Sequence, residues 1–234
     1  MAVSKIEDRN RPPVLAHLRF VAEQEAFSGL DLVARFRRIY QANLWGAASS
    51  ISGLGSEDQA TYRLRRELPG FLRALGASSL LDAPCGDGAW VLNTNLGQSY
   101  TGVDIVPELI AELSDRPRTR SGGRTYVRGD ITCDPLPRAD AILCRDCLVH
   151  LSFSNIALAI RNFRRSGCEW LVTTTFPEFG ANLDCEDGDW RALNFELAPF
   201  MWGAPARVLV EGCTEGDGGW ADKSLAAWRI AELR

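Results

Sequence analysis

Apolar positions along the chain follow two patterns, one with the spacing of a helix face and one of short continuous runs. Helical spacing occurs in five segments, at residues 14–27, 29–44, 60–75, 107–113 and 153–163. Short apolar or β-branched runs predict buried strands, at residues 80–81, 100–104, 125–129, 139–144 and 170–175. Strands that alternate with helices in this order predict an α/β fold with a doubly wound parallel sheet.

The last part of the chain has a different pattern. Two further strands are predicted at residues 206–210 and 225–230, and the segment TEGDGGW between them is typical of a hairpin connection. The polar segment before them, residues 182–200, carries mixed hydrogen-bonding groups beside aromatic rings. It is either a surface excursion or part of a binding site for a polar ligand.

The N-terminal part predicts a helical cap. Residues 1–13 are polar and end in two prolines, which predicts a loose arm. The two helices that follow would pack on the main domain. The Gly/Ser-rich segment 45–56 has the composition of a flexible linker, but it begins with Trp45, which favours an ordered segment that closes over a pocket. We therefore predict a cap and lid over residues 1–75 and a core over residues 76–234.

Composition and charge narrow the function classes. The chain has 234 residues, 46% of them hydrophobic, which suffices for a full core. A net charge of -4 gives no electrostatic signal for nucleic acid. The basic run Arg116, Arg118, Arg120 and Arg124 is interpreted as a solvated loop. No apolar run would span a bilayer and no signal sequence is visible, so we expect a cytoplasmic protein without a membrane partner.

The seven cysteines show no disulfide framework. Their odd number and scattered positions favour reduced thiols. Cys144 and Cys147 have the spacing of a redox pair, but no second pair completes a metal site, and we expect no bound metal.

Two glycines and two carboxylates define the candidate binding site. Gly86 and Gly88 follow the first strand and predict a tight turn that exposes backbone to a ligand. Asp82 ends that strand, and Asp104 ends the next one, 22 residues later. This is the arrangement of a nucleotide-binding βαβ unit, in which a carboxylate binds the ribose hydroxyls. A helix-length segment is expected between the two strands.

The residues around the glycines indicate which nucleotide. A dinucleotide fingerprint has a third glycine where this chain has Val91. The form D-x-x-C-G-x-G, from Asp82 to Gly88, resembles motif I of the class I S-adenosylmethionine-dependent methyltransferases. That ligand has no pyrophosphate, and its ammonium group suits an acidic residue near the loop. An NAD-dependent oxidoreductase remains the alternative.

The resemblance extends from about residue 35 to the end of the chain. It rests on Tyr40 with Asn43 and Trp45, on Gly53 with Gly55, and on the segments 102–106, 145–151 and 191–195. It resembles a group of bacterial small-molecule enzymes. It implies a seven-stranded, mostly parallel sheet closed by the C-terminal antiparallel hairpin.

The resemblance also implies site residues. S-adenosylmethionine would contact residues of the glycine loop, the strand ends and the lid: Trp45, Gly53, Asp82, Ala83, Cys85, Gly86, Asp104, Ile105, Asp130, Ile131, Cys144 and Arg145. Turn formation by Asp130 is the alternative. Ligands of such sheets bind beyond the carboxyl ends of the strands, so the loop after residue 145 faces the transferable methyl group.

That loop supplies the candidate catalytic residues. His150 is the only histidine of the predicted core, and its ordinary pKa near ~6.5 suits proton removal. Asp146 could be the base instead or could orient His150, and a structural His150 is the alternative. The acceptor would contact four polar or aromatic residues: Tyr40, Trp190, Arg191 and Asn194.

The sequence therefore predicts transfer of a methyl group to nitrogen or oxygen of a small polar metabolite. A sugar or amino sugar in secondary-metabolite tailoring is the preferred acceptor. A non-catalytic cofactor-binding interaction domain is a further alternative. The expected partner is the small-molecule acceptor, without nucleic acid, and a homodimer stays open.

Overall fold

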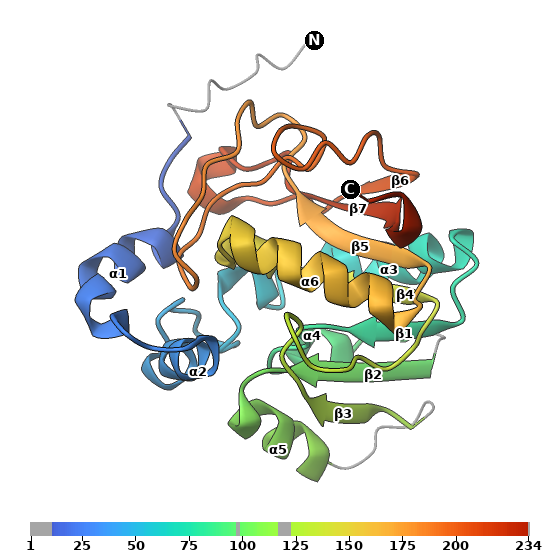
Figure 1. Ribbon diagram of the computed structural model, residues 1–234, viewed down its shortest axis with the longest axis horizontal. Helices are drawn as coiled ribbons and strands as arrows, with labels where there is room; N and C mark the ends of the chain where they lie inside the picture. Colours follow the sequence, from blue (N-terminus) through green and yellow to red (C-terminus); the bar gives the residue numbers. More distant parts are fainter. Residues whose placement is uncertain (1–10, 97–98, 117–122, 234) are drawn as a thin grey trace.

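The computed structural model describes residues 11–96, 99–116 and 123–233 (Figure 1). The first ten residues of the predicted arm lie outside the described residues, as do Arg118 and Arg120 of the basic run.

One mixed sheet organises the described part of the chain. Its strands are β1 Ser79–Asp82, β2 Ser99–Asp104, β3 Thr125–Arg128, β4 Ala141–Cys144, β5 Trp170–Thr175, β6 Arg207–Val210 and β7 Ser224–Arg229. The order across the sheet is β3-β2-β1-β4-β5-β7-β6. The pairings from β3 to β5 are parallel, whereas β7 runs antiparallel to both β5 and β6. The predicted doubly wound sheet closed by an antiparallel pair is confirmed.

Helices cover both faces of this sheet (Figure 1). They are α1 Leu15–Glu23, α2 Leu32–Ala42, α3 Tyr62–Ala74, α4 Ala89–Leu92, α5 Pro107–Asp115 and α6 Phe153–Ser166. Five short 3-10 segments join them: η2 Gln24–Phe27, η3 Leu54–Ser56, η4 Leu148–His150, η5 Glu215–Gly218 and η6 Ile230–Glu232. The boundaries of α6 follow from its caps, since Ser152 accepts a hydrogen bond from the amide of Asn155 and Gly167 adopts a left-handed conformation.

Neighbouring residues of each strand belong to opposite cores. Leu81 packs in the cluster that contains the buried face of α6, and Leu80 packs in the cluster that contains α3. This alternation is the period-two geometry of a strand covered on both sides. Because α3 packs against the sheet, it contributes to the same core as β1. The division at residue 75 stays a prediction.

Two local expectations are corrected. The helix expected after the glycine loop is the single turn α4, because Asn93 and Thr94 favour other conformations and the Thr94 hydroxyl bonds back to the carbonyl of Trp90. The predicted loose arm does not extend to residues 11 and 12. Arg11 is buried and forms an ion pair of 2.5 Å with Asp222, and the carbonyl of Pro12 accepts a hydrogen bond from Trp220.

Candidate active site

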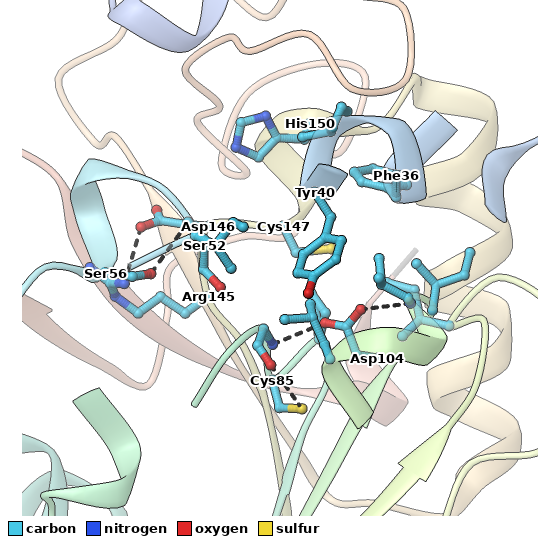
Figure 2. A pocket seen from close by; sticks show the side chains of 18 of the residues that line it. Phe36, Tyr40, Ser52, Ser56, Cys85, Asp104, Arg145, Asp146, Cys147 and His150 are labelled. Carbon is cyan, nitrogen blue, oxygen red and sulfur yellow. Dashed lines mark hydrogen bonds and ion pairs between the residues drawn. The ribbon is translucent and has the colours of Figure 1, made fainter. Parts of the chain in front are cut away.

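Two adjoining cavities lie at the carboxyl ends of the parallel strands. The glycine loop lines the first cavity, and aromatic side chains line much of the second. Trp45, Ser52, Asp146 and His150 line both, so these four residues mark the junction. In Figure 2, Asp104 and Cys85 lie at one end of the first cavity and His150 at the other.

Asp104 holds the glycine loop in place. One carboxylate oxygen accepts a hydrogen bond of 2.9 Å from the amide of Gly86, and the other accepts one of 2.9 Å from the amide of Val106. Burial raises the pKa of Asp104 to about 6, although these amides favour its ionised form. Asp104 and Ile105 both line the first cavity, at the end of β2.

Asp82 lies deeper beside the same loop. It lines the first cavity and accepts a hydrogen bond of 2.6 Å from the Tyr100 hydroxyl. Burial raises the pKa of Asp82 to about 7. Cys85 and Gly86 also line this cavity, whereas Ala83 is fully buried in the core behind it.

Segment 45–56 folds over the glycine loop. Ser50 and the amide of Ile51 donate hydrogen bonds to the Asp87 carboxylate, and the Asp87 amide donates to the Ser52 hydroxyl at 2.9 Å. A Cβ atom on Gly86 would lie 2.3 Å from that hydroxyl, so a glycine is required at this contact. These bonds favour the ordered segment over the flexible linker. Sequence reasoning missed Ser52 because serines in a Gly/Ser-rich stretch carry no distinguishing signal.

The far wall of the first cavity contains Asp130 and Ile131. One Asp130 oxygen accepts hydrogen bonds from the amide and hydroxyl of Thr132, so Asp130 forms the turn while it lines the cavity. Tyr40 lines this cavity too, and its hydroxyl donates to Glu112 on α5 at 2.8 Å. Burial and Glu112 raise the pKa of Tyr40 to about 12. Tyr40, predicted to contact the acceptor, thus lines the first cavity and not the second.

A buried ionic network adjoins the junction. Arg145 donates to both Glu211 oxygens and to the carbonyl of Gly55, and it lies 3.2 Å from an Asp146 oxygen. Lys223 donates to the same Asp146 oxygen at 2.7 Å. Burial would raise the pKa of Asp146, but the two cations hold it well below its usual range. A carboxylate paired in this way is a poor proton acceptor.

His150 is held in a defined tautomer. Its Nδ1 lies 2.7 Å from the carbonyl oxygen of Asp189, which can only accept, so Nδ1 carries the proton and Nε2 the lone pair. The ring stacks on Trp45 with centroids 4.5 Å apart. Burial lowers the pKa of His150 to about 4, so the imidazole is neutral at pH 7.

Protonation of His150 is expected to destabilise the fold in acid. Its folded pKa of about 4 lies below the ordinary 6.5, so the unfolded chain binds the proton first as the pH falls. The contribution of neutral His150 to the free energy of unfolding is fully present above pH 6.5. As the pH falls toward 4, this free energy decreases by up to about 3 kcal/mol. Denaturant unfolding at both pH values should show a smaller acid loss for His150→Gln than for the unsubstituted protein. Equal losses would contradict this role of the histidine.

The second cavity is walled by aromatic rings. Trp45, Phe176, Trp190 and Trp220 line it, together with Gly53, which sequence reasoning had placed at the cofactor. Phe176 and Trp220 were missed as site residues, because an isolated aromatic residue is usually part of the core.

Arg191 and Asn194 line neither cavity. Arg191 donates to the carbonyls of Leu148 and Leu151, on either side of His150. Asn194 donates to two carbonyls of the chain after β5. Both therefore hold the His150 loop and the 182–200 segment through backbone carbonyls, and their predicted contact with an acceptor stays a prediction. Cys144 is fully buried in the core, and its carbonyl accepts a hydrogen bond from Thr173.

Few features of the described residues indicate a metal site, a membrane span or a disulfide. No group of three or more histidine, cysteine or acidic side chains there is arranged to hold a metal ion. The described helices are all too short or too polar to cross a bilayer. Cys144 and Cys147 are both free thiols, and Cys147 lines the first cavity.

Comparisons with known proteins agree with the fold. Residues 80–166 match the family described as a methyltransferase domain. No curated protein matches the chain in a sequence search.

Solved structures of methyltransferases superpose on most of the chain. Magnesium protoporphyrin IX methyltransferase from Synechocystis PCC 6803, with bound S-adenosylmethionine, is 14% identical, with a TM-score of 0.59 over 86% of this chain and 98% of its own. The Burkholderia thailandensis 1,6-didemethyltoxoflavin-N1-methyltransferase, with bound S-adenosylhomocysteine, is 18% identical, with a TM-score of 0.56 over 93% and 92%. Human N-acetylserotonin methyltransferase is 14% identical, with a TM-score of 0.58 over 86% and 60%.

Several of these structures hold S-adenosylmethionine or its product, in agreement with the predicted cofactor. The chain therefore has the Rossmann-like fold of the class I S-adenosylmethionine-dependent methyltransferases, and its residues 80–166 match the family described as a methyltransferase domain.

Proposed function

We propose that the protein transfers a methyl group from S-adenosylmethionine to nitrogen or oxygen of a small polar metabolite. The observation that carries the proposal is the junction of the two cavities. One contains the glycine loop and the strand-end carboxylates, the other has aromatic walls, and they meet at His150 and Asp146. A cofactor in the first would present its methyl group to an acceptor in the second.

The first cavity offers a partner for each part of the cofactor. Asp104 would accept the ribose hydroxyls, and Asp130 with Ile131 and Ile105 would bind and flank the adenine. The loop from Asp82 to Gly86 would hold the amino acid part. Arg145 lines the same cavity. Tyr40 would cover the bound cofactor from α2.

The second cavity would hold the acceptor. Its rings can stack on a sugar or on a planar heterocycle, and Asp146, Lys223 and Glu215 supply polar contacts. A sugar or amino sugar therefore stays the preferred acceptor, as the sequence predicts. The three superposed enzymes act on small molecules by name, which supports a small acceptor here.

Calorimetric titration tests the cofactor. S-adenosylhomocysteine is expected to bind in the micromolar range, and NAD, the parallel control, is expected not to bind. Binding of NAD alone would favour the oxidoreductase alternative. Binding of S-adenosylhomocysteine without turnover on any screened sugar, amino sugar or aromatic amine would favour a non-catalytic binding domain.

His150→Asn is expected to reduce turnover while cofactor affinity stays unchanged. Asparagine can keep the hydrogen bond to the Asp189 carbonyl, but it removes Nε2, the nitrogen that would accept the proton. General-base catalysis typically contributes about 100-fold or more, so kcat should fall by about that factor. Release of S-adenosylhomocysteine measures turnover, and calorimetry measures affinity. Unchanged kcat would remove His150 from this role.

A further inference from the structure

The charges around the second cavity do not balance. Arg145 and Lys223 are the two cations of the buried network, Asp146 and Glu211 are its two carboxylates, and the half-buried Glu215 is a third carboxylate beside it. Glu211 is bound by Arg145, and Asp146 is bound by Lys223 and Arg145. This leaves one carboxylate in excess.

Glu215 is the carboxylate in excess. It lies in η5, lines the second cavity and has no ion pair with any described residue. Burial raises its pKa, while nearby Lys223 opposes the shift. An uncompensated, partly buried carboxylate is unfavourable, and a positive group placed beside it would remove that cost.

The aromatic walls favour the same kind of ligand. The rings of Trp190 and Trp220 meet edge to face, with centroids 4.9 Å apart. The centroid of the Phe176 ring lies 5.5 Å from that of Trp220 and 5.8 Å from that of Trp190. Ring faces attract cations and also bury the carbon skeleton of a ligand. Arg11 already lies 5.1 Å from the Trp220 ring, but it is paired with Asp222 and adds no net charge.

We propose that the second cavity selects acceptors that carry a protonated amine on an apolar or ring-shaped body, with Glu215 as counter-ion of the ammonium. The inference rests on the proposed function, because it assigns the acceptor class of the same site. The ammonium is the group by which the acceptor is recognised, and the methylated atom is the one that reaches the junction at His150.

The test uses matched probes on the protein loaded with S-adenosylhomocysteine. Tryptamine, N-acetyltryptamine and indole-3-propionate form one set, and glucosamine, N-acetylglucosamine and glucuronate form the other. In at least one set, the amine is expected to bind about tenfold or more tightly than its neutral and acidic partners, measured by calorimetry. Glu215→Gln should abolish this preference and leave the affinity for S-adenosylhomocysteine unchanged.

Asp217→Asn is the matched control. It removes the same charge from an exposed residue of the same 3-10 segment and should leave the preference intact. Amines that bind no more tightly than their neutral partners, or no binding in either set, would overturn the proposal.

One further comparison tests whether Glu215 binds the ammonium group of the acceptor or the positively charged sulfur of the cofactor. If Glu215→Gln weakened S-adenosylmethionine relative to S-adenosylhomocysteine, and the amine preference persisted, Glu215 would serve the sulfonium and the proposal would fail. Failure of S-adenosylhomocysteine to bind the unsubstituted protein would instead remove the proposed function itself.

Discussion

Asp104→Asn should weaken S-adenosylhomocysteine binding by about 100-fold, the effect of losing two hydrogen bonds to a charged group at ~1.5 kcal/mol each. The substitution keeps the size of the side chain. It removes the charge that would bind the ribose hydroxyls, and its single oxygen can accept from only one of the Gly86 and Val106 amides, because the side-chain nitrogen only donates. Calorimetric titration measures the loss.

The control for this substitution is Asp115→Asn, which changes an exposed carboxylate at the end of α5. It should leave the affinity unchanged. The pH dependence gives a second check. Because the pKa of Asp104 is about 6 in the free protein, affinity should fall as the pH drops below that value, and the Asn variant should lack this fall. Retained affinity in Asp104→Asn would exclude the assigned ribose contact.

Glu211→Gln is expected to lower the free energy of unfolding by about 3 kcal/mol, as found when one partner of a buried ion pair is removed. The Arg145 and Glu211 side chains are 4% and 2% exposed, so the arginine would be left beside Asp146 alone. Urea unfolding followed by circular dichroism measures the change.

A matched exposed pair provides the control. Glu169 binds Arg229 on the surface, with side chains 54% and 48% exposed. Glu169→Gln should cost less than about 1 kcal/mol, because solvent screens exposed pairs. Similar losses for the two variants would show that the buried network does not hold the junction together.

Local patterns predicted the first cavity well. The glycine loop, Asp104 and Asp130 all lie at strand ends, and strand ends can be located from short apolar runs alone. In a parallel sheet these ends gather at one edge, so residues from β1, β2 and β3 were placed together correctly. The one-turn helix α4 was not foreseen, because helix length depends on propensities that vary within a few residues.

The four residues predicted to contact the acceptor do not lie in one cavity, since Trp190 lines the second cavity and Tyr40 lines the first. Arg191 and Asn194 have the residue types of a polar binding site, but backbone carbonyls take up their donors. Whether a polar side chain faces a cavity or the backbone depends on the path of the 182–200 segment. No periodic pattern encodes that path.

The sequence by itself determined the order of strands and helices, the glycine loop and the carboxylates of the first cavity, because each depends on residues close together in the chain. Only the tertiary structure decided the ionic network and the second cavity. Lys223 reaches Asp146 across 77 residues and Glu211 reaches Arg145 across 66. These contacts form because β7 pairs antiparallel with both β5 and β6. This pairing brings the end of β6 and the start of β7 to the edge of the sheet where the parallel strands end.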